Sequence, residues 1–186
     1  MSSILKVSEI QDPTNGNTAL SVGSDGFVVL PQSPKIYALF RNTANVTADG
    51  DITAWEVPDT GITANNIGDA FTHSSGVWTF PRTGVYRVIA TAAIENASGD
   101  NVAAVILQTT SDSGSNYVTI AYQAVGSNGS NKEYGNICLT ALVNITNTST
   151  QKLKMGARSI ASGSYVYGRT EHSRTTISFE WMAPPQ

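Results

Sequence analysis

The chain has 186 residues, of which 40% are hydrophobic and only 13% charged, and its formal net charge is −3. Its many β-branched and aromatic residues exclude a disordered chain, and the absence of a basic cluster excludes nucleic-acid binding through phosphate contacts. No run approaches the roughly 18 apolar residues of a membrane helix, so we expect no membrane insertion. This length fits one all-β domain with an accessory segment better than two full domains.

Residues 1–31 differ from the rest of the chain. Short strand-like runs at 3–10, 19–22 and 27–30 alternate with clusters of Gly, Asn and Asp that predict turns. Because so few strands do not bury a core alone, we expect this segment to need a partner, either the main domain, sister chains or a host surface. The apolar side chains expected to make this attachment are Ile4, Leu5, Val7, Ile10, Leu20, Val22, Phe27 and Val29.

Residues 32–34 are predicted to be a linker, and residues 35–186 to form the main domain. Alternating and aromatic runs separated by polar turns, without a helical period, predict strands. The expected strands are 35–43, 52–57, 65–73, 77–80, 84–94, 102–110, 116–123, 134–145, 151–158 and 175–182. Ten short strands with polar turns are typical of a β-sandwich or barrel.

The most informative stretch runs from Gly68 to Ile94. Pro81 cannot donate to a ladder, so we place it at a strand end, and Gly84 supplies the positive φ that a tight turn needs. From Val85 onward the residues alternate, and every second residue from Tyr86 is apolar or aromatic. This period predicts a long strand with one face in the core.

The order of these motifs resembles the globular head of the C1q/TNF superfamily. The matching motifs are Lys35–Phe40, Trp78–Phe80, Gly84–Tyr86 and Ile177–Trp181. The resemblance implies a ten-stranded jelly-roll sandwich over residues 35–186 that assembles as a homotrimer. Candidates for the core or the trimer interface are Tyr86, Tyr134, Phe179 and Trp181.

The N-terminal segment resembles the attachment segments of tail-fibre and other virion proteins of marine and cyanobacterial phages. Those segments commonly open with Ile-Leu-Lys-Val, an acidic residue and Ile-Gln-Asp, the order found in Ile4–Asp12. The resemblance implies that residues 1–31 attach the protein to the virion and entwine the trimer. The expected location is the virion surface, after synthesis in the cytoplasm of a bacterial host.

Two functions on the virion remain open at this point. In the first, the protein decorates or cements the capsid and binds the major capsid protein. In the second, it is a tail-fibre or spike tip that is held by a tail or baseplate protein and binds a host receptor. We favour the first narrowly, because the chain has no long stem that reaches toward a receptor.

Tyr and Arg residues gather in the loop-rich stretch 162–176. These residue types anchor interfaces. The candidates for contact with a host glycan or host protein are Tyr165, Tyr167, Arg169, His172 and Arg174. The alternative for the two tyrosines is that they pack on one strand face at the trimer seam.

The sequence shows no metal-ligand spacing, nucleophile elbow or phosphate-binding loop, so we expect no enzyme and no cofactor. Carboxylate pairs such as Asp49 and Asp51 leave a glycan hydrolase as a remote alternative. The same Asp-Gly-Asp segment lacks the full spacing of a calcium loop, and bound calcium stays open. His73 is expected to be a neighbour of a turn, and Cys138, in an apolar run, to be buried.

Overall fold

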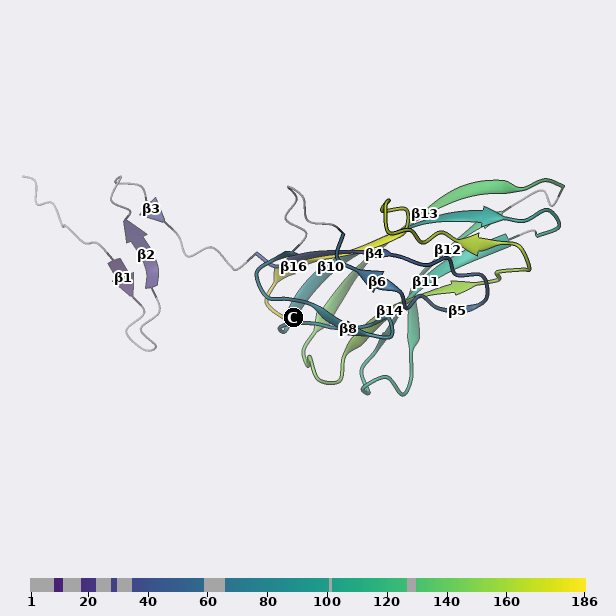
Figure 1. Cartoon of the computed structure of the whole chain (residues 1–186). Coiled ribbons are helices and arrows are strands. Elements are labelled where there is room, and N and C mark those ends of the chain that lie inside the picture. The colour runs from purple at the N-terminus through teal and green to yellow at the C-terminus, as the bar shows by residue number, and fades with distance from the viewer. Residues whose placement is uncertain are drawn as a thin grey trace, which may run out of the picture. The chain divides into compact units, whose positions relative to one another are not determined.

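The structure is a computed structural model that describes residues 9–11, 18–22, 28–29, 35–58, 66–100, 102–126 and 130–186. The chain divides into two compact units, residues 1–35 and residues 36–186. In the first unit, β1 (Glu9–Gln11), β2 (Thr18–Val22) and β3 (Val28–Val29) form an antiparallel sheet in that order (Figure 1). The expected strands of this unit are therefore found in part, and the rest lies outside the described residues.

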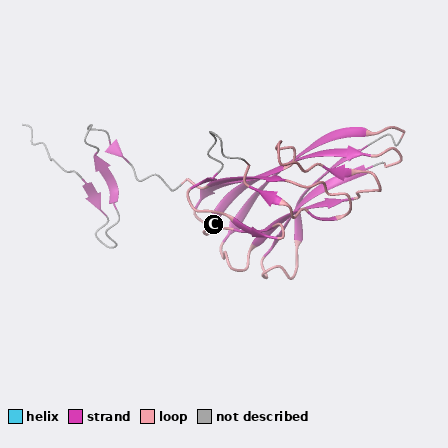
Figure 2. Ribbon diagram, viewed as in Figure 1, coloured by secondary structure: helices cyan, strands magenta, loops and turns pink. Residues whose placement is uncertain are grey.

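The second unit, called the head below, is a sandwich of two antiparallel sheets, and its described residues contain no helix (Figure 2). The first sheet, called the β10 sheet, has the order β13-β10-β16-β4-β6, and β7 and β15 pair with β4 and β10. Its strands are β4 (Tyr37–Asn42), β6 (Trp55–Glu56), β7 (Asn66–Ile67), β10 (Gly84–Asn96), β13 (Glu133–Ile145), β15 (Tyr165–Val166) and β16 (Thr176–Ala183).

The second sheet of the head, called the β11 sheet, has the order β12-β11-β14-β9-β8, and β5 pairs with β14. Its strands are β5 (Gly50–Asp51), β8 (Thr72–Ser74), β9 (Val77–Thr79), β11 (Val102–Thr110), β12 (Val118–Gly126) and β14 (Lys152–Arg158). Five strands follow one another across each sheet, which agrees with the predicted all-β sandwich of ten main strands.

The predicted core face of β10 is confirmed. Its buried side chains are Tyr86, Val88, Ala90, Ala92 and Ile94. The strand pairs with β13 along its whole length and with β16 on its other side. Because both neighbours satisfy its backbone, β10 is an interior strand that extends through the length of the sheet.

Aromatic side chains from both sheets meet in the core. Phe179 of β16 stacks on Phe71 with ring centroids 4.5 Å apart, and it contacts Trp78 and Phe80 at 5.5 and 5.9 Å. All four side chains are buried. Aromatic pairs at such separations add about 0.5–1.5 kcal/mol each to the stabilisation from burial, so this cluster is a principal link between the two sheets.

The chain crosses between the sheets at two of the predicted strands. The stretch 52–57 was expected as one strand, but only Trp55–Glu56 of it forms a strand, β6, which pairs with β4, whereas β5 just before it pairs with β14. The stretch 65–73 is divided likewise into β7 and β8, between which Gly68 has a φ of 76°. The apolar residues Ile67 and Phe71 lie on the two sides of Gly68, so the apolar pattern in the sequence hides that crossover.

Cys138 is exposed, so the expectation that it is buried is wrong. It lies on β13 between Ile137 and Leu139, which are both buried. Since neighbouring residues of a strand point to opposite faces, the thiol faces outward. The run Ile-Cys-Leu looks uniformly apolar in the sequence, which concealed its period of two.

Gly84 is predicted to be intolerant of any side chain. Its φ is 150°, and an added Cβ would lie 2.0 Å from Nε1 of Trp181 and 2.8 Å from the carbonyl oxygen of Ala183. We expect Gly84→Ala to lower the free energy of unfolding by about 2 kcal/mol or more, measured by urea denaturation. Gly50→Ala is the matched control, because nothing lies within 4 Å of its added Cβ. Equal effects of the two substitutions would contradict this account of Gly84.

Candidate functional site

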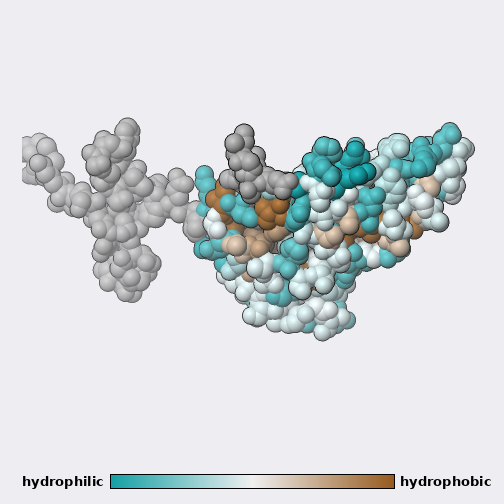
Figure 3. All heavy atoms as spheres, viewed as in Figure 1, coloured by the Kyte–Doolittle hydropathy of each residue, from teal (hydrophilic) through white to brown (hydrophobic). Residues whose placement is uncertain are grey.

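The head has two opposite ends, called the base and the tip. At the base, Trp181 donates its backbone N–H to the carbonyl of Ile36 at 2.9 Å, and Gln186 exchanges hydrogen bonds of 2.7 and 3.2 Å with Asn144. At the tip, β10 reaches Glu95, about 35 Å from its start at Gly84 at the usual rise of a strand. The head therefore begins and ends at the base (Figure 1). On the face drawn in Figure 3, a hydrophobic patch lies toward the base and a hydrophilic patch lies at the upper middle of the head, while further hydrophobic residues line the lower side toward the tip.

At the tip, the carboxylate of Glu95 lies at the centre of a cluster of hydrogen-bonded side chains. Glu95 is only 2% exposed. Its Oε2 accepts hydrogen bonds from the hydroxyls of Tyr165 and Tyr167, the latter at 2.7 Å, and its Oε1 pairs with Nζ of Lys132 at 2.6 Å. The bond from Lys132, followed by those from the tyrosines, lowers the pKa of Glu95 to about 2. The site therefore holds a buried, ionised carboxylate.

Strand register explains why these residues meet. Tyr165 of β15 and Tyr134 of β13 are the cross-strand partners of Glu95 on its two sides. The rings of Tyr165 and Tyr167 lie edge to face with centroids 4.7 Å apart, and the guanidinium of Arg174 lies 4.6 Å from the Tyr167 ring centroid. Burial, with the hydrogen bonds to Tyr165 and Glu95, raises the pKa of Tyr167.

The structure brings together three of the five predicted receptor contacts, namely Tyr165, Tyr167 and Arg174. Tyr167 is only 8% exposed and its hydroxyl is bound to Glu95, which gives it a structural role at the tip, and its contact with a receptor, like that of Tyr165, stays a prediction. Arg169, His172 and Arg174 are exposed in the segment between β15 and β16. For these three, contact with a receptor remains a prediction.

The two sheets approach each other along β12 and β13, called the β12–β13 edge below. The side chain of Gln123 accepts a hydrogen bond from the backbone N–H of Cys138, and that of Asn96 donates to the carbonyl of Val125, both at 3.2 Å. A Cβ added at Gly135 would lie 2.3 Å from the Val125 side chain. Side-chain bonds and close packing thus join β12 of the β11 sheet to β13 and to the end of β10 in the β10 sheet.

Large apolar side chains are exposed along this edge. They are Val118, Ile120, Tyr122, Tyr134 and Leu142. Leu142 is 70% exposed, and with Val118 and Ile120 it lines a cleft of about 360 Å³. Because exposed apolar groups gathered at one place mark contacts with other molecules, this edge is a candidate interface.

The candidates for the core or the trimer interface occupy different environments. Tyr86 and Phe179 lie in the core, and the Tyr86 hydroxyl donates to the carbonyl of Arg82 at 2.9 Å. Trp181 packs against the core while partly buried, and its Nε1–H donates to the carbonyl of Thr83 at 3.3 Å. Tyr134 is 69% exposed on the β12–β13 edge, which leaves it available to a partner.

The predicted attachment residues belong to the first unit. Ile10, Leu20, Val22 and Val29 lie in the strands β1, β2 and β3. Ile4, Leu5, Val7 and Phe27 lie outside the described residues. Attachment through these side chains therefore remains a prediction.

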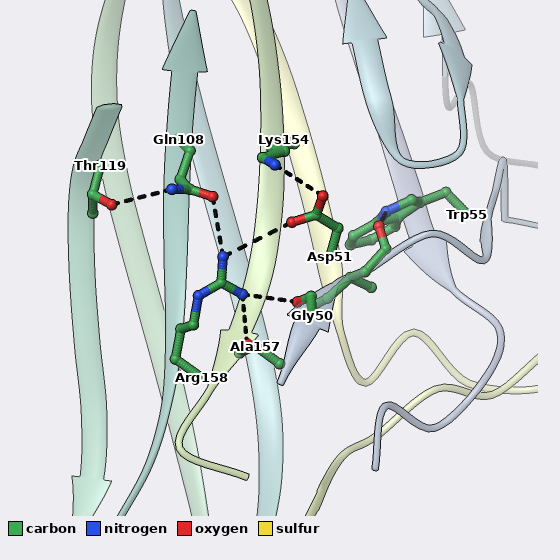
Figure 4. A network of polar contacts seen from close by, with 9 residues as sticks. Gly50, Asp51, Trp55, Gln108, Thr119, Lys154, Ala157 and Arg158 are labelled. Carbon is green, nitrogen blue, oxygen red and sulfur yellow. Dashed lines mark hydrogen bonds and ion pairs between the residues drawn. The ribbon is translucent and has the colours of Figure 1, made fainter. Parts of the chain in front are cut away.

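The Asp-Gly-Asp segment belongs to a polar network on the outer face of the β11 sheet (Figure 4). Asp51 pairs with Nζ of Lys154 at 2.9 Å and lies 3.9 Å from Nη2 of Arg158, and Asp49 accepts a hydrogen bond from the backbone of Ile160 at 2.7 Å. Two cationic neighbours of Asp51 oppose the binding of calcium there. In the described parts of the chain, no three His, Cys, Asp or Glu side chains gather to hold a metal ion.

The other residues singled out in the sequence have ordinary surroundings. His73 lies directly before the Ser-Ser-Gly turn, and its ring packs against Phe40 and Trp78 at 5.6 and 5.9 Å. Glu56 pairs with Arg41 at 2.7 Å.

Over the ranges that the structure describes, no helix has the length and apolar character needed to cross a membrane.

Sequence reasoning missed Glu95 and Lys132. The period of two that puts Ile94 in the core puts Glu95 on the opposite face of β10, so the sequence pattern predicts an exposed carboxylate there and gives no signal of its burial. Lys132 gives no signal either, because its partner is 37 residues away in the sequence.

Comparison with known proteins identifies the fold of the head. No protein-family model and no curated protein matches the chain. Among solved structures, Eiger TNF from S. frugiperda is 16% identical with a TM-score of 0.61, over 83% of this chain and 96% of that one. Murine APRIL is 6% identical with a TM-score of 0.57, over 80% of this chain and 99% of that one. The head therefore has a TNF-like jelly-roll fold.

Acid should weaken the tip through Glu95. The pKa of Glu95 is lower in the folded chain than its ordinary value, so ionised Glu95 contributes stability that is complete above about pH 5 and is lost as the pH falls toward 2. We expect the free energy of unfolding of the wild type to fall more steeply than that of Glu95→Gln over this range. Urea denaturation at a series of pH values measures both, and parallel curves would contradict the assignment.

Proposed function

We propose that this protein is a homotrimeric structural protein on the surface of a phage particle, with its head projecting outward. The observation that supports the proposal is that the head starts and ends at one end, the base, while its exposed charged segment lies away from the base. The head begins and ends at its base, whereas the charged segment with Arg169, His172 and Arg174 lies away from it. A head held at the base therefore presents other surfaces to the medium.

The proposed trimer draws on the fold and on the β12–β13 edge. Trimeric assembly is the expectation from the C1q/TNF resemblance, and the head has a TNF-like jelly-roll fold. In a threefold ring each copy contributes two different surfaces to every contact. The exposed apolar side chains of Val118, Ile120 and Leu142 make the β12–β13 edge suitable as one of them.

Within this proposal the protein decorates the capsid, and residues 1–31 bind the major capsid protein. Only residues 32–34 separate this segment from the predicted head, which favours a head close to the particle surface over one on a long stem. The second candidate is a tail-fibre or spike tip that binds a host glycan or protein. The resemblance of residues 1–31 to fibre attachment segments and the exposed basic side chains favour that alternative.

The trimer is tested by the mass of the purified protein in solution. Light scattering should give about three times 19.6 kDa for the wild type. Leu142→Arg places a charge on the β12–β13 edge and should shift the mass toward one copy while the head stays folded. Ser162→Arg, an exposed position near the tip, is the control and should keep the trimer. A wild-type mass of 19.6 kDa would contradict the proposal.

The attachment role is tested by deleting residues 1–31. The shortened chain should fold, because the core of the head lies entirely within residues 36–186, but it should fail to join phage particles. Full-length Arg174→Ala, altered only on the surface, should join them normally. Immunoblotting of purified particles measures both, and normal incorporation of the shortened chain would overturn the assignment.

A further inference from the structure

The two oxygens of the Glu95 carboxylate have different kinds of partner. Oε2 accepts hydrogen bonds from the hydroxyls of Tyr165 and Tyr167, whose backbones are fixed beside β10. Oε1 pairs with the ammonium of Lys132, which precedes β13 in the chain. The tyrosines therefore orient the carboxylate independently of the ammonium that it binds.

The Glu95 carboxylate is buried, whereas the lysine that supplies its ammonium partner is exposed. The side chain of Glu95 is 3% exposed, whereas that of Lys132 is 61% exposed. Lys132 thus approaches the carboxylate from solvent, and its stem fills little of the core. If the ammonium leaves, an oriented carboxylate is left near the surface without a charge to balance it, which is costly. Such a group favours the return of a cation.

The surroundings of Oε1 suit a primary ammonium in particular. Tyr134 of β13 is the cross-strand partner of Glu95 on one side and is 69% exposed, and Tyr165 of β15 is its partner on the other side. Tyrosine rings attract cations, and a primary ammonium brings three N–H donors in a compact head. A quaternary ammonium has no donor for Oε1 and is expected to bind poorly.

We propose that Glu95, Tyr165 and Tyr167, with Tyr134 beside them, form a binding site for a primary alkylammonium group. In the isolated chain Lys132 fills this site, and an amine from outside can take its place. The donor is either a small free amine or the lysine side chain of another protein, which share this chemistry. The site is independent of the role on a virion, so its failure would leave the proposed function standing.

The test uses full-length Lys132→Ala and n-propylammonium, which matches the part of the side chain that the substitution removes. The substitution should lower the melting temperature by several degrees, because it leaves the Glu95 carboxylate without its cation. Increasing n-propylammonium at constant ionic strength should then restore at least half of the loss, with saturation. Tetramethylammonium and n-propanol should restore none of it.

The double variant Glu95→Gln/Lys132→Ala is the matched control and should show no saturable response to n-propylammonium. An equal response of the single and double variants, or no response of Lys132→Ala, would overturn the site. Nα-acetyl-lysine amide distinguishes the donors: a response to it as well supports a protein lysine, and a response to n-propylammonium alone supports a small free amine.

If Lys132→Ala fails to fold, the wild type provides the test by NMR. Excess n-propylammonium should shift the amide signals of Glu95, Tyr134 and Tyr165 in a saturable way as it displaces Lys132. Glu95→Gln should lose these shifts. Absence of shifts in the wild type, or equal shifts in Glu95→Gln, would refute the proposal.

Discussion

The contact of Phe179 with the aromatic side chains around it is the interaction on which the head depends. Phe179 is completely buried in the middle of the β10 sheet, and it touches Phe71, Trp78 and Phe80. These contacts set the position of β16 against the other sheet. Trp181, two residues further on, then packs against Gly84 and begins the base, so the same strand links the core to the end where the head starts.

The interior changes character from base to tip. Aromatic packing dominates near the base, whereas the tip contains buried polar side chains joined by hydrogen bonds. Besides the Glu95 site, the hydroxyl of Ser164 donates to Asp100 at 2.5 Å and accepts a hydrogen bond from the backbone of Ala97 at 2.8 Å. The tip is thus shaped by directional contacts, whereas the two sheets are held together by apolar packing.

The sequence predicted the fold better than the site, for physical reasons. The stretch Gly68–Ile94 predicted β10 and its core face, because a period of two in a half-buried strand is a local pattern. The crossover between β5 and β6 left no local trace, because the run from Ile52 to Val57 has the β-branched and aromatic residues that are typical of a single strand. Glu95 and Lys132 were missed because an ion pair between distant residues depends on strand register, which single residues do not reveal.

The proposed role combines a TNF-like head, an exposed apolar edge and an N-terminal segment that resembles phage attachment segments. Its most direct test is the number of copies of this chain per purified phage particle, counted against the major capsid protein by quantitative mass spectrometry. Hundreds of copies per particle are the predicted result and agree with capsid decoration. A few trimers per particle would assign the protein to the tail, and its absence from particles would contradict the role on the virion.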